Sequence, residues 1–252
     1  MKKNTLPDFE KNHTRSTKRC LTWLSLCLIF LFGSASYAQV SAYLFEQSTG
    51  TYQSIAADGV LVPGTDATAT TTYDTSSWEV ALPFTFTFNA IDYTSIFVNS
   101  NGGATFGLTS SVSSVISSTT AFEGSIGVMN RDLWGVFVTS GITTSGSNTI
   151  TDVASFRGIA IGKSLRTGSG VPAGTTITAF NEVAGTITMS TNATSSSATA
   201  SIGWGSGSIF TKVEGIAPNR IFTIQWEGYN DYGTTSTSSN YLTFQLKLSE
   251  TL

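Results

Sequence analysis

Apolar and polar residues alternate strictly along several stretches of the chain. Phe84, Phe86 and Phe88 alternate with threonine, and the same period of two runs from 221 to 226 and from 242 to 248. Successive side chains of a strand point to opposite faces, so each stretch predicts a strand with one buried and one solvated face. No stretch after residue 38 shows a convincing helical period. The pattern therefore predicts an all-β chain.

Turn residues separate these stretches. Residues 89–92 lie between the expected strands 84–88 and 93–99 and predict a hairpin, and Ser100-Asn101-Gly102 precedes a short apolar run at 104–106. The Ser- and Thr-rich residues 109–120 are compatible with a weak edge strand or with a long surface loop. Short strands joined by such turns favour an antiparallel β-sandwich, jelly-roll-like in character.

The middle of the chain differs in composition from both flanks. Between 141 and 205 aromatic residues are scarce, and Gly, Thr, Ile and Ala dominate. Because an insertion at a surface loop costs little closure entropy, we interpret 141–205 as a small β unit inserted into the sandwich. The sandwich itself is then built from 39–140 and 206–252.

The first 38 residues have the pattern of a secretory signal peptide. A basic front end precedes the apolar run Leu21–Phe32, and Gly33–Ala38 supplies small residues for cleavage before Gln39. Two alternatives are a membrane anchor and a lipoprotein signal ending at Cys27. Twelve helical residues span only about 18 Å, and Leu26 occupies a position where a lipoprotein signal needs a small residue. We therefore expect a protein that is secreted or on the outer cell surface, without membrane insertion of the mature chain.

Cleavage there would remove the chain's chemically most versatile side chains. His13, Cys20 and Cys27 all precede residue 39, so the remainder has no imidazole and no thiol. This excludes Ser-His-Asp and Cys-His catalysis and histidine-bound zinc in the mature chain. We expect no cofactor. Calcium is the metal that an oxygen-only ligand set would suit, yet no Asp-x-Asp-x-Asp-Gly loop occurs, and Asp66 and Asn230-Asp231 are isolated candidates that suit turns equally well.

The charge balance excludes another class of partner. The whole chain carries 13 Lys and Arg and 16 Asp and Glu, and the leader holds six and two of these, which leaves a net charge of −7. Nucleic acid and anionic lipid attract clustered basic residues, so we expect neither as a partner.

Several motifs together are similar to a known module. They are Leu82–Asn89, Val98–Gly102, Asn130–Leu133, Ala217–Trp226 and Phe244–Leu248. This set resembles a β-sandwich module of secreted, surface-displayed bacterial proteins of the adhesion type, and its last two motifs are similar to the end of nidogen-type extracellular domains. The resemblance implies a fold and a location rather than an activity.

The middle segment resembles a different unit. Ile150–Val153, Gly170–Ile177 and Ile187–Ala193 are similar to a small Gly- and Thr-rich β unit of bacterial surface and phage-associated proteins. This resemblance implies no catalytic role.

The candidate ligand-binding residues are Tyr229, Asn230, Asp231 and Tyr232. They fall in a polar stretch, 228–239, that we expect to be a loop between two strands. Aromatic rings beside Asp and Asn are suited to stacking on a sugar, and loops carry function more often than strands do. The alternative interpretation is that the tyrosines fold back onto the sandwich.

Three other residues have structural interpretations. We expect Arg131 and Asp132 to form a charge-assisted pair that holds strands together, although they could line a pocket. Arg220, after Pro218-Asn219, is expected to tie a turn, and Trp226 to lie in the core.

These observations favour a noncatalytic surface module that binds a neutral carbohydrate or a protein in adhesion. Polysaccharide or a cell-surface protein is the expected partner. The alternative is a structural spacer of a larger surface protein. A carboxylate-dependent hydrolase is a more distant possibility, because no pair of acids is singled out by spacing.

Overall fold

The computed structural model describes residues 44–68, 71–107, 124–233 and 240–251. The expected signal peptide at 1–38 and the uncertain stretch 109–120 lie outside these ranges. The chain divides into a unit of residues 1–50 and a unit of residues 51–252. In the first unit, residues 44–50 are exposed and have no regular secondary structure.

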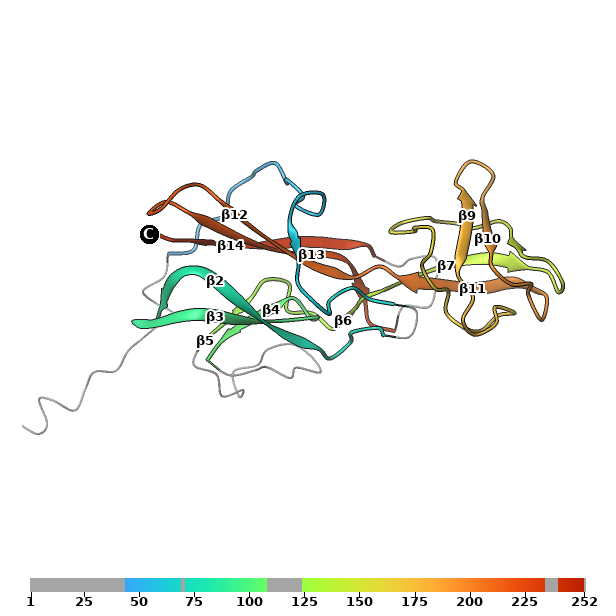
Figure 1. Cartoon of the computed structure of the whole chain (residues 1–252), viewed down its shortest axis with the longest axis horizontal. Helices are drawn as coiled ribbons and strands as arrows, with labels where there is room; N and C mark the ends of the chain where they lie inside the picture. Colours follow the sequence, from blue (N-terminus) through green and yellow to red (C-terminus); the bar gives the residue numbers. More distant parts are fainter. Residues whose placement is uncertain (1–43, 69–70, 108–123, 234–239, 252) are drawn as a thin grey trace, which may run out of the picture. The chain divides into compact units, whose positions relative to one another are not determined.

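Two antiparallel sheets of the second unit form a sandwich (Figure 1). The first sheet has four strands in sequence order: β2 (Ser77–Phe88), β3 (Ile91–Asn99), β4 (Gly103–Phe106) and β5 (Gly124–Gly127). The second has the order β1 (Val60–Leu61), β12 (Ser208–Glu214), β13 (Ile221–Asp231) and β14 (Leu242–Ser249), with β6 (Leu133–Trp134) paired to the end of β13. The described residues contain strands and no helix, which confirms the predicted fold class.

The predicted hairpin joins β2 and β3. Phe88 pairs with Ile91, and the two connecting residues, Asn89 and Ala90, adopt φ angles of 54° and 60°. The turn after β3 also forms as predicted. Gly102 has a φ of 71°, and a Cβ there would lie 2.7 Å from the Cβ of Met129, so that only glycine fits.

The sandwich core is built from the inward faces of both sheets. Ile96 and Phe106 come from the first sheet and Ile224 and Trp226 from the second, and all four are fully buried. The indole Nε1 of Trp226 donates a hydrogen bond of 2.7 Å to the backbone oxygen of Asn99, which joins the two sheets. Trp226 thus lies in the core as predicted. Among the other apolar residues of the alternating stretches, Phe84 is buried, whereas four are half-buried at the core's margin: Phe86, Phe88, Phe244 and Leu246.

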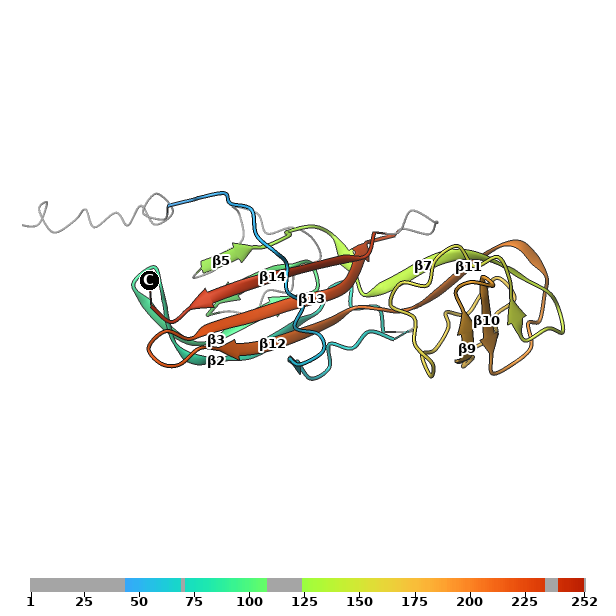
Figure 2. The ribbon, with the colours of Figure 1, turned by 90° about the horizontal axis from the view of Figure 1, so that it is seen from above.

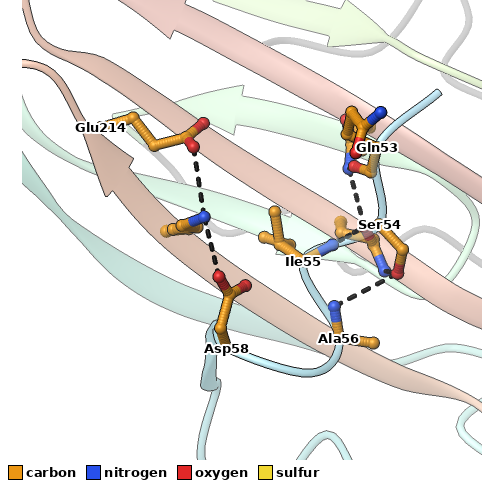
Figure 3. A network of polar contacts seen from close by, with 9 residues as sticks. Gln53, Ser54, Ile55, Ala56, Asp58 and Glu214 are labelled. Carbon is orange, nitrogen blue, oxygen red and sulfur yellow. Dashed lines mark hydrogen bonds and ion pairs between the residues drawn. The ribbon is translucent and has the colours of Figure 1, made fainter. Parts of the chain in front are cut away.

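The polar face of β13 is not solvated as the alternation predicted. Gln225 is fully buried because residues 53–58 cross over this face (Figure 3). The side chain of Gln225 accepts from Ile55 N at 2.9 Å and donates to Ser54 Oγ at 3.0 Å. Lys212 on β12 forms an ion pair of 3.0 Å with Asp58 at the end of the crossing. On the face of this sheet that points away from the sandwich core, polar contacts therefore hold residues 53–58 against β12 and β13.

A second hydrophobic core lies in the middle segment. Its strands are β7 (Val136–Thr143) paired with β11 (Ser197–Gly205), and β8 (Thr149–Ile150), β10 (Thr186–Met189) and β9 (Ile177–Asn181) in a separate sheet (Figure 2). Ile150, Ile177 and Ile187 are fully buried in this core. The core extends to Phe137, before the expected start of the unit at 141, because β7 and β11 continue without interruption from the sandwich side into the small unit.

Among the described residues, none belongs to a helix that could span a membrane.

Candidate functional site

Three of the four predicted binding residues lie at the end of β13, and Tyr232 lies in the turn that follows it. Residues 229–231 belong to this strand, which bends at Gly228 and shifts register between Trp226 and Tyr229. Asn230 pairs with Trp134 and Asp231 with Leu133 on β6. The expectation of a loop was wrong for residues 228–231, because a distant segment supplies a strand partner that the adjacent sequence does not reveal. Residues 232 and 233 form a turn, and residues 234–239 lie outside the described ranges.

Tyr229 is fully buried, so the expectation that its ring faces solvent was wrong. A side chain at Gly207 would begin 3.3 Å from the ring carbon Cζ of Tyr229, which shows how closely the backbone covers the phenol. Burial raises the pKa of Tyr229 above its usual range, and its hydroxyl has no hydrogen-bond partner among the described residues. For this tyrosine the alternative interpretation, folding into the sandwich, is the correct one.

Asn230 is also fully buried and has a structural contact. Its amide Nδ2 donates a hydrogen bond of 2.9 Å to the backbone oxygen of Val136, the first residue of β7. Asn230 therefore fixes the start of the β7–β11 ribbon to the sandwich and does not present its amide at the surface.

Asp231 is held by two side chains. Arg131 contacts it through Nε at 2.6 Å and through Nη2 at 3.0 Å, and Asn240 Nδ2 donates to it at 2.7 Å. The expected pairing of Arg131 with Asp132 was thus wrong in its partner: Asp132 contributes a backbone oxygen that accepts from Tyr232 N at 3.0 Å. The ion pair still has the expected role, since it links the start of β6 to the end of β13.

Tyr232 is the one member of the predicted set whose ring is exposed, with 53% of its surface accessible. It packs edge-on against Trp134, with ring centroids 5.7 Å apart and planes at 74°. Trp134 is nearly buried, and the guanidinium of Arg166 lies 5.0 Å from the centre of its ring. We call Tyr232, Trp134, Arg131, Asp231 and Asn240 the Tyr232 patch.

A second feature is a cavity of about 350 Å³ lined by residues 66–68, 160–164 and Gly205, which we call the Lys163 hollow. The hollow lies beside residues 203–207, where one backbone edge bonds first to Arg166 and then to Ala67. Arg166 N bonds to Gly203 O at 2.8 Å, and Ala67 N bonds to Gly207 O at 2.8 Å. Gly205 lies between these two contacts, and its carbonyl accepts from Lys163 Nζ at 2.6 Å.

Two charged residues, Lys163 and Asp66, line this hollow. Burial lowers the pKa of Lys163, and the negative charge of Asp66 acts in the opposite direction. Asp66 accepts a hydrogen bond of 3.1 Å from Ser208 Oγ. Among the described residues no group of three or more His, Cys, Asp or Glu side chains could hold a metal ion, so neither Asp66 nor Asn230-Asp231 belongs to such a cluster.

Sequence reasoning singled out Asp66 for another purpose and missed Lys163. A lysine after Gly162 in a turn-rich stretch is an unspecific signal, and nothing local indicates that it meets residue 66. Arg220, by contrast, behaves as a structural residue: its guanidinium binds Glu250 and donates to Pro83 O at 2.8 Å, which ties β13 to β14 and to β2.

Comparison with known proteins identifies one family. The model of the family described as NIDO-related matches residues 42–204 and 197–252, and the two matches overlap within β11. This match confirms the expected similarity to nidogen-type domains. No curated protein and no solved structure gives a significant match.

Proposed function

Because this chain belongs to the NIDO-related family, we propose that it is an extracellular, noncatalytic module that binds a neutral carbohydrate or a protein in adhesion. The family match favours an extracellular module, and the leader pattern at 1–38 is consistent with export. The binding site that we propose is the Tyr232 patch.

The observation that carries the proposal is the exposure of Tyr232 beside polar groups. An aromatic ring combines a large apolar face with low conformational entropy, which suits it to pack against the C–H face of a sugar or against an apolar side chain. Trp134 supports the ring from the side, so that little ordering is needed on binding.

Polar groups next to the ring would fix the orientation of a ligand. The side chain of Arg131 is 58% exposed although it holds Asp231 through two nitrogens. A guanidinium carries five N–H donors in a fixed plane, and those turned to solvent can donate to ligand oxygens. The acidic balance of the chain disfavours sulfated or other polyanionic glycans, so that a neutral glycan or a protein surface is the better match.

A glycan array followed by calorimetry with the best neutral oligosaccharide tests the proposal. Tyr232→Ala should weaken binding by about 1–3 kcal/mol, by analogy with a nucleic-acid base stacked on an aromatic side chain, and Tyr232→Phe should retain the affinity. Tyr52→Ala is the matched control, because Tyr52 is equally exposed but lies on the segment that leads to the crossing over β13.

Two results would contradict this function. If no glycan and no protein partner binds, the alternative of a structural spacer gains support. If a glycan binds and Tyr232→Ala has the affinity of the wild type, the site lies elsewhere. The melting temperature of each variant should stay unchanged, which separates a binding effect from a folding effect.

A further inference from the structure

We infer that the Lys163 hollow is a second binding site, which takes a single hydroxyl-bearing sugar unit of a neutral glycan. The inference rests on the proposed function for the class of ligand but not on the Tyr232 patch. It is carried by the shape of the hollow and by the charges that face it.

A glycine lets one wall of the hollow lie directly against β11. A Cβ at Gly205 would collide with the backbone oxygen of Ala67, so no side chain can stand there without moving that wall. Gly205 and the segments 66–68 and 160–164 together line the hollow. A volume of about 350 Å³ is at the lower end of the range found for small-molecule sites.

Lys163 is held at the wall of this space. A lysine near a surface usually extends its ammonium into water, but here Nζ donates to Gly205 O at 2.6 Å and is partly desolvated. An ammonium has three donors. With one donor directed at Gly205, the others are available to an oxygen atom of a molecule in the hollow.

Asp66 supplies the opposite charge. Its carboxylate is oriented by Ser208 Oγ at 3.1 Å and lines the same hollow. A ligand carboxylate attracted to Lys163 would be repelled by Asp66, and a ligand ammonium attracted to Asp66 would be repelled by Lys163. A hydroxyl group satisfies both, because it accepts from the ammonium and donates to the carboxylate.

The remaining lining suits the same ligand. Ala67 and Ala160 offer small apolar contacts for C–H groups, and the lining residue Ser164 carries a hydroxyl group. Charge-assisted hydrogen bonds are the stronger kind, so a single sugar unit held by Lys163 and Asp66 can be selected without an aromatic platform.

Two-dimensional ¹H–¹⁵N NMR of the whole chain tests this inference, with glucose, galactose and N-acetylglucosamine as neutral probes and acetate as the charged probe. At least one neutral sugar should shift the amide signals of Gly162, Ser164 and Gly205 in a saturable way, and acetate should not. Lys163→Met should weaken this binding about tenfold or more, as expected for loss of a hydrogen bond to a charged group.

Asp66→Asn gives the sharper variant. It keeps an oxygen to accept from Ser208 but removes the negative charge, so the neutral sugar should bind more weakly while acetate begins to shift the same signals. Lys247→Met is the matched control, since Lys247 is an exposed lysine of β14 and should leave both responses unchanged.

Three results would overturn the inference: no response to any neutral sugar, an equal response of the wild type to acetate, or an unchanged affinity in Asp66→Asn. The result for Asp66→Asn tests the inference even if Lys163→Met perturbs the fold, and the spectrum of Lys163→Met would reveal such a perturbation. Tyr232→Ala should retain the response of the hollow. If a sugar shifts the signals of the hollow but Tyr232→Ala has no effect on glycan affinity, only the Tyr232 patch fails. If Tyr232→Ala weakens glycan binding but no sugar shifts the signals of the hollow, only the Lys163 hollow fails.

Discussion

The sandwich and the small middle unit are both made of strands, yet they are stabilised differently. The sandwich has long strands, 12 residues in β2 and 11 in β13, and its core contains stacked aromatic rings such as Phe106 with Phe88. The small unit has strands of two to five residues outside the β7–β11 ribbon, and its core is mostly aliphatic, with Phe137 and Trp204 as its buried aromatic residues. Its turns are closed by hydroxyl groups, for example Thr175 Oγ1 donating to Pro172 O at 2.8 Å.

This difference explains the location of the candidate sites. Pairing is continuous along β12 and β13 in the sandwich, whereas the β7–β11 ladder ends with Gly205 paired to Val136, and the carbonyl of Gly205 accepts from Lys163. Trp134, beside the exposed Tyr232, lies just before β7 at the same change of region. Where regular strand pairing ends, backbone N–H and C=O groups bond to side chains instead, and such positions can also bind ligands.

The largest effect is expected from Trp226→Ala in the sandwich. The substitution removes a buried indole stacked on Phe244 at 5.2 Å, together with the hydrogen bond that the indole donates to Asn99 O. We expect a loss of about 3–5 kcal/mol in the free energy of unfolding, measured by circular dichroism in urea. A loss below about 1 kcal/mol, the level of an ordinary surface change, would show that the sandwich core does not depend on this contact.

Ile187→Ala probes the small unit in the same way. Ile187 is fully buried in the second core, and its truncation should cost about 2–5 kcal/mol locally. Amide hydrogen exchange should accelerate in β9 and β10 but not in β12 and β13. Val183→Ala, at a fully exposed position between β9 and β10, is the control. Faster exchange in both regions would mean that the two cores open together.

Gly205→Ala tests the boundary between the regions. The new Cβ would meet the backbone oxygen of Ala67, whereas at Gly203 it would meet the flexible side chain of Arg166 at 2.9 Å. We expect about 1–3 kcal/mol of destabilisation for Gly205→Ala and a smaller loss for Gly203→Ala, where Arg166 can move aside. Equal melting temperatures for the two variants would contradict the close approach at Gly205.

The smallest effect concerns the ion pair that closes the sandwich. Hydrogen bonds from Arg220 lower the pKa of Glu250 in the folded chain. As the pH falls, the unfolded chain therefore takes up this proton first, and the stabilisation is lost between the unfolded and the folded pKa of the carboxyl group. Glu250→Gln should flatten the decline of the urea midpoint below about pH 4.3, the usual value for glutamate. An identical pH profile for both proteins would show that the pair contributes nothing.

Much of the fold could be predicted from the period-two pattern. The alternation located the second half of β2, the first half of β13, β14 and the central position of Trp226, and the turn residues located β3 and the turn at Asn89, because each depends on local sequence. The alternation failed for Gln225, whose polar side chain is covered by residues distant in sequence. Alternation reports which residues share a face, but it does not report what lies over that face.

The candidate site was predicted less well for the same reason. Tyr229 and Tyr232 have similar neighbours in sequence, but β6 pairs with the end of β13 and buries the first while the second follows the strand. Lys163 and Asp66 line the same hollow only because two distant segments bind successive parts of one strand edge. Such long-range pairing is set by the whole fold and leaves no local signal.

A crystal structure of the chain with the neutral oligosaccharide that binds best on the array tests most directly whether ligands are recognised where the two regions join. We predict a sugar ring against Tyr232, or a sugar unit in the Lys163 hollow with hydroxyl groups at Lys163 and Asp66. A sugar bound instead on the β5 side of the first sheet, or against the crossing of residues 53–58 over β13, would contradict this account.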